Sequence, residues 1–173
     1  MELIPVFAGV LLALMLNNWQ ENRKDARFIN KLSEAVSKEL QQNTESLERV
    51  LQRQSVFMDT LQHYLDDESV SLGEVLQRGG GLQLATIQNA AQTALLSSKI
   101  DLLDIDEVLF FTELNESKKL MNLKVQDLMD LALDNVVSTE KDSKLALMIQ
   151  ISNLIDSEQQ LLEMQKDYLA GDQ

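Results

Sequence analysis

The chain of 173 residues has no cysteine, one proline and one histidine. Without cysteine it cannot form disulfide bonds, use a thiol in catalysis or bind zinc through thiolates, and its redox compartment stays open. Only six glycines are present, three of them consecutive. Because glycine and proline are the residues that interrupt helices most strongly, their scarcity favours an all-α fold.

Basic residues are also few. The sequence holds 15 Lys and Arg against 28 Asp and Glu, which gives a formal net charge of −13. Binding to nucleic acid needs cationic side chains that displace counterions from phosphates, so we expect no nucleic-acid partner. With 45% hydrophobic residues the chain is not expected to be disordered, and it is long enough for one domain with a buried core.

The longest apolar run covers residues 3–16 (LIPVFAGVLLALML) and contains no charge. Asn17, Asn18 and Trp19 follow it, and then a charged stretch begins. An apolar helix that ends in an amphipathic Trp and charged residues is typical of a segment leaving a bilayer. The sequence therefore predicts a transmembrane anchor over residues 1–19, with lipid-facing positions Leu3, Phe7, Leu11, Leu12, Leu14, Leu16 and Trp19.

The anchor is short for this role. Fourteen helical residues reach roughly 21 Å, whereas the hydrocarbon core is about 30 Å thick. Either the native chain begins further upstream, or the helix inserts with local thinning of the bilayer. A cleaved signal peptide and a buried helix of a soluble domain are the alternatives. The first would need a basic start and a small-residue cleavage site, which the sequence lacks.

A long amphipathic helix is predicted after the anchor. No Gly or Pro occurs between Trp19 and Gly73, and apolar residues recur at helical spacing to about Leu65. Residues 41–46 (QQNTES) have no apolar side chain, and we interpret them as a solvated stretch or a site of bending. Four apolar residues that step by four form a predicted interaction face: Phe28, Leu32, Val36 and Leu40.

The rest of the chain is predicted to fold back in several helices. Ser71 and Glu74 have the spacing of a capping box and start a short helix, and a Gly-rich turn at 79–81 follows it. Three further helices are expected: from near Thr86 to Ser98, from a cap at Asp104 to Val137, and from a cap at Ser138 or Thr139 to Gly171. The product is a transmembrane helix that continues into an antiparallel helical bundle over residues 20–173.

No group of residues in the sequence has the spacing of a catalytic, cofactor or metal site. His63 has acids nearby, but a solvated His at a helix end is far more common than a metal ligand. Ser97, Ser98 and Lys99 lack the desolvated surroundings that a Ser–Lys nucleophile needs. Five methionines are interpreted as core residues: Met58, Met121, Met129, Met148 and Met164. We therefore predict no enzyme activity, no cofactor and no metal.

Residues 9–24 (GVLLALMLNNWQENRK) resemble the opening segment of an uncharacterised family of small bacterial single-pass membrane proteins, a domain of unknown function, in which an apolar helix runs into Asn-Asn-Trp. Residues 91–103 (AQTALLSSKIDLL) are similar to its mid-chain pattern. The resemblance implies a bacterial inner-membrane protein with a helical domain. It implies no activity and no cofactor. Members of the family commonly carry a basic segment before the anchor, and this chain has none.

Two signals give opposite topologies. Arg23, Lys24, Arg27 and Lys31 would keep the downstream domain in the cytoplasm, whereas the resemblance favours a periplasmic domain, which we expect. The predicted function is that of a membrane-anchored protein-protein interaction or assembly module. Its partners would be the lipid bilayer and either a second copy or another membrane protein. The alternative is an extracytoplasmic helical bundle that senses a small ligand of unknown identity.

Overall fold

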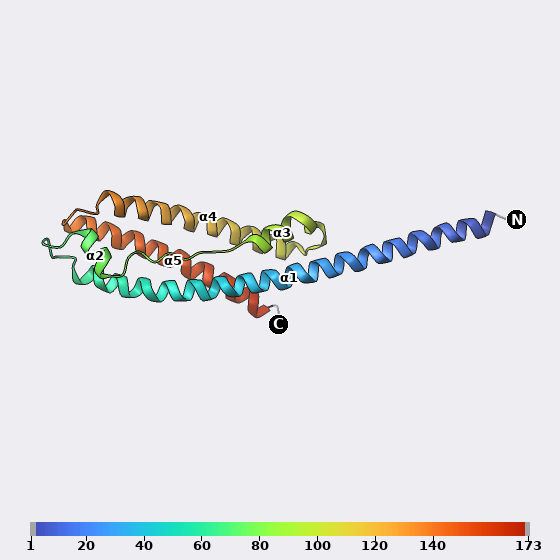
Figure 1. The fold of residues 1–173 in the computed structure, drawn as a ribbon, viewed down its shortest axis with the longest axis horizontal. Helices are drawn as coiled ribbons and strands as arrows, with labels where there is room; N and C mark the ends of the chain where they lie inside the picture. The colour runs from blue at the N-terminus through green and yellow to red at the C-terminus, as the bar shows by residue number, and fades with distance from the viewer. Residues whose placement is uncertain (1–2, 172–173) are drawn as a thin grey trace. The chain divides into compact units, whose positions relative to one another are not determined.

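The computed structural model describes residues 3–171, without the side chains of residues 3–8, 10 and 99. Throughout this part of the chain the regular structure is helical (Figure 1), which confirms the all-α fold. The elements in order are α1 (Leu3–His63), α2 (Leu72–Arg78), α3 (Ala90–Lys99), the short 3₁₀ helix η1 (Ile100–Leu102), α4 (Ile105–Asp134) and α5 (Lys141–Gly171).

The chain forms two compact units. The N-terminal unit comprises residues 1–38 and 89–103, which include the first part of α1, α3 and η1. The bundle unit comprises residues 39–88 and 104–173, which include the rest of α1 together with α2, α4 and α5. Helix α1 contributes to both units.

In the bundle unit α5 runs antiparallel to α1 (Figure 1). Lys166 Nζ lies 2.6 Å from Glu48 Oε1, and Lys144 Nζ donates a hydrogen bond of 2.6 Å to the carbonyl oxygen of Asp67. Residue numbers thus fall along α5 as they rise along α1 and the turn that follows it. The antiparallel packing that the sequence predicts is confirmed.

Helix α4 also packs antiparallel to α5. Lys124 Nζ donates to the carbonyl oxygen of Asn153 at 3.1 Å, and Ser143 Oγ donates to Asn135 Oδ1 at 3.1 Å near the turn that joins the two helices. The bundle unit therefore contains three long helical segments, and α5 runs antiparallel to the other two.

The core positions of these three segments repeat every seven residues. This spacing keeps one seam of each helix facing its neighbours, as in a coiled coil. Most of the repeating positions are apolar, but one in α1 and three in α5 are polar. The buried rows are Leu40, Leu47, Gln54 and Leu61 in α1, Leu114, Met121 and Leu128 in α4, and Lys144, Ile151, Glu158 and Gln165 beside Leu147, Leu154 and Leu161 in α5.

The interpretation of residues 41–46 as a solvated stretch is wrong for Asn43 and Thr44, whereas Gln41, Gln42 and Glu45 are exposed. Helix α1 continues through them without a break. Asn43 is 1% exposed and Thr44 is 7% exposed. These polar side chains are buried because they have partners: Thr44 Oγ1 donates to the carbonyl oxygen of Gln41 at 2.8 Å, and Asn43 binds a distant backbone segment.

The predicted capping box at Ser71 and the predicted cap at Asp104 are present. Glu74 N–H donates to Ser71 Oγ at 3.3 Å, and Ser71 N–H donates to Glu74 Oε2 at 2.8 Å. At the start of α4, Asp104 N–H donates to Glu107 Oε2 at 3.4 Å. Both pairs satisfy backbone donors that the first turn of a helix leaves free.

Two predicted helix starts are wrong. Helix α5 begins at Lys141, so neither Ser138 nor Thr139 is its cap; Ser138 Oγ instead accepts from Glu140 N–H at 3.3 Å inside the turn. Helix α3 begins at Ala90, whereas the sequence predicted a start near Thr86. Residues 82–89, called the extended segment below, form no helix.

Candidate functional site

The extended segment is held by side chains of α1. Asn43 Nδ2 donates to the carbonyl oxygen of Gln88, and Gln88 N–H donates to Asn43 Oδ1, both at 2.8 Å. Gln54 Nε2 donates to the carbonyl oxygen of Gln83 at 2.9 Å. A helix would satisfy these backbone groups internally. Here buried amide side chains replace the missing backbone partners.

Glu158 is a buried carboxyl group beside Gln54 and Ala85. It is 0% exposed, and burial raises the pKa of its carboxyl group to about 7, although the Gln54 side chain and the Ala85 N–H act in the opposite direction. Neither carboxyl oxygen reaches the geometry of a hydrogen bond, and the buried Gln54 Oε1 also lacks a donor. A protonated carboxyl group supplies one O–H donor, which suits such an acceptor. The protonated form therefore fits this core better than the carboxylate.

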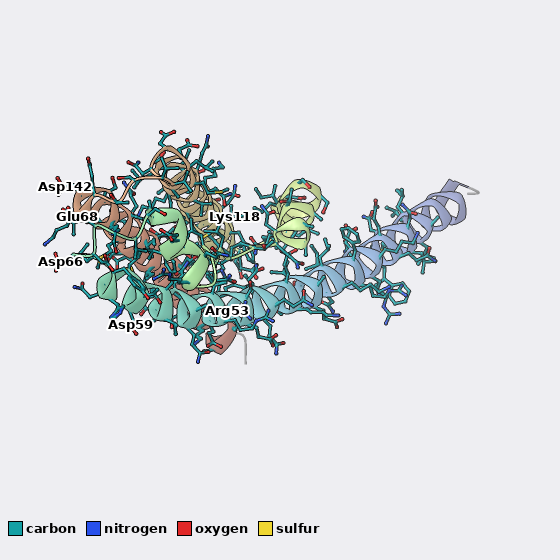
Figure 2. The ribbon with its side chains drawn as sticks, turned by 60° about the vertical axis from the view of Figure 1, so that its left-hand side comes forward. Arg53, Asp59, Asp66, Glu68, Lys118 and Asp142 are labelled. Atoms are coloured by element: carbon teal, nitrogen blue, oxygen red, sulfur yellow. The ribbon has the colours of Figure 1, made fainter. Side chains whose placement is uncertain are left out.

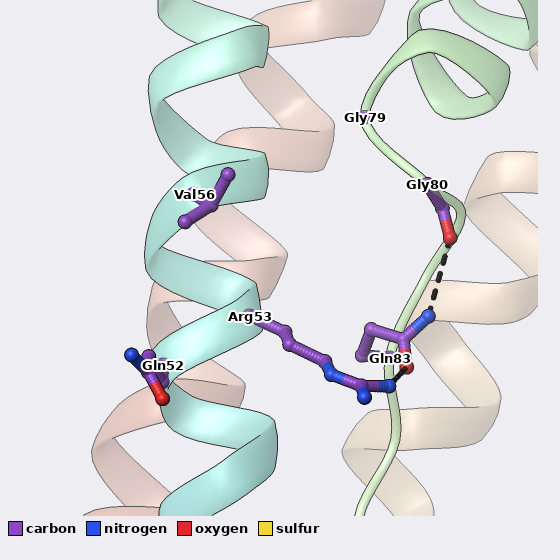
Figure 3. A pocket seen from close by; sticks show the side chains of 6 residues that line it. All are labelled: Gln52, Arg53, Val56, Gly79, Gly80 and Gln83. Atoms are coloured by element: carbon purple, nitrogen blue, oxygen red, sulfur yellow. Dashed lines mark hydrogen bonds between the residues drawn. The ribbon is translucent and has the colours of Figure 1, made fainter.

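A pocket of about 420 Å³ lies beside the glycine turn. Figure 3 shows its polar side chains linked in a chain: Arg53 Nη1 donates to Gln83 Oε1 at 3.0 Å, and Gln83 Nε2 donates to the carbonyl oxygen of Gly80 at 3.2 Å. The N–H groups of residues 79–81 donate to carbonyl oxygens of α2, so they do not face the pocket as free donors. The polar groups here fix the turn in place.

The glycines of this turn are required by two different constraints. A Cβ atom on Gly79 would collide with the ring of Phe57, which is buried in α1. Gly80 and Gly81 have φ of 82° and 79°, a region that side chains with a Cβ rarely adopt. The Gly-rich turn that the sequence predicts is therefore a close-packed joint between α2 and the extended segment.

The other candidate residues take structural positions. His63 is exposed, and its ring lies edge-on to Tyr64 at 4.7 Å. Ser97 and Ser98 both donate to the carbonyl oxygen of Ala94, and the side chain of Lys99 lies outside the described set. Among the residues that the structure describes, no cluster of His, Cys, Asp or Glu could hold a metal ion.

The described anchor positions are all exposed. This holds for Leu11, Leu12, Leu14, Leu16 and Trp19, while the side chains of Leu3 and Phe7 lie outside the described residues. The guanidinium carbon of Arg23 lies 4.3 Å from the centroid of the Trp19 ring. Along the part of the chain that the structure describes, no helix is both long enough and apolar enough to cross a membrane.

The four positions of the predicted interaction face differ in exposure. In the N-terminal unit Phe28 is 43% exposed, Leu32 is half-buried and Val36 is buried. Leu40 is fully buried and belongs to the core of the bundle unit. Of the four, Phe28 is thus the side chain that leaves most of its surface open.

Met129 does not occupy the core, so its interpretation as a core residue is wrong. It is 45% exposed near the end of α4, whereas Met121 is buried on the same helix. The reason is the seven-residue register, which places Met121 in the seam and Met129 one position after the buried Leu128. Met58, Met148 and Met164 are half-buried.

The charge of the chain is concentrated in one unit. The bundle unit contains 23 acidic and 9 basic residues, a net charge of −14, whereas the N-terminal unit contains 5 acidic and 6 basic residues, a net charge of +1. Figure 2 shows Asp66, Glu68 and Asp142 gathered at the end of the bundle unit where α1 ends and α5 begins. One of them, Asp66, pairs with Lys141 at 2.6 Å.

Comparison with known proteins adds no relative. No protein-family model matches the chain. No curated protein and no solved structure matches it either.

Proposed function

We propose that this chain is a non-enzymatic membrane protein, in which the N-terminal part of α1 is a single-pass anchor and the helical bundle docks onto another protein. The observation that carries the proposal is the exposure of successive apolar side chains in α1, from Leu11 to Leu16. A helix that is apolar on all sides needs an apolar environment around it. Residues 3–10 extend the same apolar run in the sequence.

The residues that follow the run support the same reading. Trp19 has an apolar ring with a polar N–H, the character of side chains that lie at the level of lipid head groups. Arg23 stacks on this ring, and such a cation–π contact keeps the guanidinium close to the point where the helix would leave the bilayer. We propose the bacterial inner membrane as the location, because of the resemblance of residues 9–24.

The net charge of the bundle unit favours a protein over lipid as its partner. An anionic lipid surface repels a unit with a net charge of −14, so lipid is a poor partner for the bundle. The N-terminal unit has a net charge of +1, so an anionic lipid surface does not repel it. We place the bundle in the periplasm, where it would meet another membrane protein or a second copy.

Ligand sensing has weaker support. The pocket at Arg53 has the volume of a small-molecule site. Its polar groups, however, bind one another and the glycine turn, so few are left to orient a ligand. The docking function therefore explains more of the observations.

Membrane attachment can be tested with the whole chain and liposomes. Deletion of residues 1–19 should move the protein from the membrane fraction to the soluble fraction. Asp in place of Leu12 and Leu14 should do the same, because a charge near the bilayer centre costs about 2.5–3.5 kcal/mol per residue. The matched control replaces Leu120 and Leu123, exposed leucines of α4, by Asp. Sedimentation of the deletion variant with membranes would contradict the anchor.

A further inference from the structure

The bundle unit has an apolar groove beside the end of α4. It has a volume of about 240 Å³ and is lined by Leu76, Leu82, Met129, Ala132, Leu133 and Val136. Leu76 belongs to α2 and Leu82 to the extended segment. Met129, Ala132 and Leu133 belong to the last turns of α4, and Val136 lies two residues after its end. Leu133 is 67% exposed and Met129 is 45% exposed, so part of this apolar lining is open to solvent.

The last turns of α4, which line the groove, also carry Asp130 and Asp134. Asp130 and Asp134 directly follow Met129 and Leu133 in α4, and no Lys, Arg or His occurs between residues 125 and 140. The side chain of neither aspartate makes a hydrogen bond or ion pair within the described part of the chain, and both residues are exposed. The nearest lysines in the sequence are engaged: Lys124 with Ser157, and Lys141 with Asp66.

The positions of these aspartates are unfavourable for α4 itself. The C-terminal end of a helix carries a partial negative charge and favours cations, yet the last turn of α4 has no basic residue. Asp130 and Asp134 are also four residues apart, so their like charges repel each other on one helix face. Two acids that weaken the helix, on the same turns as exposed apolar side chains, favour a positively charged partner.

The volume of the groove suits apolar side chains of a partner protein better than a free small molecule. Small-molecule sites have volumes of about 300–1,000 Å³ and contain a few polar groups that orient the ligand. This groove is smaller, and its lining is apolar. A groove of this kind receives the apolar residues of one helix face.

We propose that the groove binds an amphipathic helix of a separate protein, whose apolar face fills the groove and whose flanking Lys or Arg residues pair with Asp130 and Asp134. The inference rests on the proposed function, because it names the docking surface of the bundle and the chemistry of the partner. Net charges of opposite sign would speed the encounter, and the apolar contacts would slow dissociation.

The test uses the full chain in nanodiscs of zwitterionic lipid and two fluorescent peptides of about 16 residues, roughly four helical turns. Both peptides carry the same row of leucines; one is flanked by lysines and the other by glutamates. Fluorescence anisotropy should give an affinity for the lysine peptide at least about tenfold higher than for the glutamate peptide. Empty nanodiscs measure binding to lipid alone. Equal affinities for the two peptides would overturn the proposal.

Variants locate the binding surface. Met129→Ser with Leu133→Ser should weaken binding of the lysine peptide by about tenfold or more. Asp130→Asn with Asp134→Asn should weaken it and reduce its dependence on salt. Leu120→Ser with Leu123→Ser, on exposed positions of the same helix outside the groove, should leave it unchanged. A loss as large in this control as in the groove variant would show that the groove is not the site.

Two further measurements separate the alternatives. If the chain self-associates in sedimentation experiments and Met129→Ser with Leu133→Ser abolishes this association, the occupant is a second copy and the proposal of a separate protein is overturned. Liposome flotation of the groove variants should equal that of the unaltered chain. Failure of the anchor would appear only in flotation of the deletion variant, whereas failure of the groove would appear only in peptide binding.

Discussion

Asn43 binds the backbone of Gln88 at both its donor and its acceptor, through two hydrogen bonds of 2.8 Å. The two residues are 45 positions apart in the sequence. A single amide side chain thus does for the extended segment what a neighbouring strand does in a sheet. Its replacement removes two backbone partners at once.

Asn43→Ala should therefore lower the free energy of unfolding by about 1–3 kcal/mol, since it removes two hydrogen bonds and each contributes about 0.5–1.5 kcal/mol. Denaturant unfolding of the full chain in detergent measures the loss. Hydrogen exchange should show faster exchange at Gln88. Gln42→Ala, at an exposed position one residue earlier, is the control and should change the free energy by less than about 0.5 kcal/mol. Equal stability of the two variants would contradict the role of Asn43.

Glu158 should make the stability of the bundle depend on pH. Its pKa is about 7 in the folded chain against an ordinary value of 4.5, so the folded state binds more protons than the unfolded state between these values. The contribution of this group to stability is therefore largest below pH 4.5 and is lost as the pH rises towards 7. The total loss is about 3 kcal/mol, at 1.36 kcal/mol per pKa unit.

Glu158→Gln should remove this part of the pH dependence and stabilise the bundle at pH 8. The measurement is the difference in unfolding free energy between the variant and the unaltered chain at pH 5 and pH 8, which cancels the other carboxyl groups. Glu163→Gln, at an exposed position of the same helix, serves as the control. A constant difference between the two pH values would refute the assignment.

Gly79→Ala should destabilise the glycine turn. The added Cβ would collide with the buried Phe57 ring, and overpacking of this kind costs about 1–3 kcal/mol. Thermal unfolding measures the change. Gly171→Ala has no atom within 4 Å of its new Cβ and should be neutral or slightly stabilising. A melting temperature equal for both variants would be inconsistent with the close packing at Gly79.

Lys144 and Lys141 allow a matched comparison at the start of α5. Lys144 is fully buried and donates to the carbonyl oxygen of Asp67, whereas Lys141 pairs with Asp66 on the surface. Lys144→Met should cost about 1–3 kcal/mol because it removes a charge-assisted hydrogen bond from a partly buried carbonyl. Lys141→Met should cost at most about 1 kcal/mol. The order of the two losses in denaturant unfolding is the check.

Local signals predicted most helices of this chain correctly. The capping boxes at Ser71 and Asp104 depend on residues three positions apart, so they can be read directly from the sequence. The continuity of α1 likewise follows from the absence of Gly and Pro after Trp19. Such features depend on neighbours along the chain and need no knowledge of the fold.

The extended segment could not be predicted in this way. Ile87 and the alanines after it have helical spacing, but the partners that keep residues 82–89 out of a helix are Asn43 and Gln54, about 30–45 positions earlier. A seven-residue register could have indicated Glu158 and Gln165, because both fall in the row of Ile151. The groove at Leu133 gave no local signal, since exposed leucines are common.

The extended segment takes its hydrogen-bond partners from side chains of α1, and this has a consequence for the order of folding. Asn43 and Gln54 come into position only after α1 has formed, and Glu158 only after α5 has packed beside it. We therefore expect the segment to join last, onto helices that are already assembled. It should also leave first, in a partial opening that exposes polar side chains while the helices stay intact.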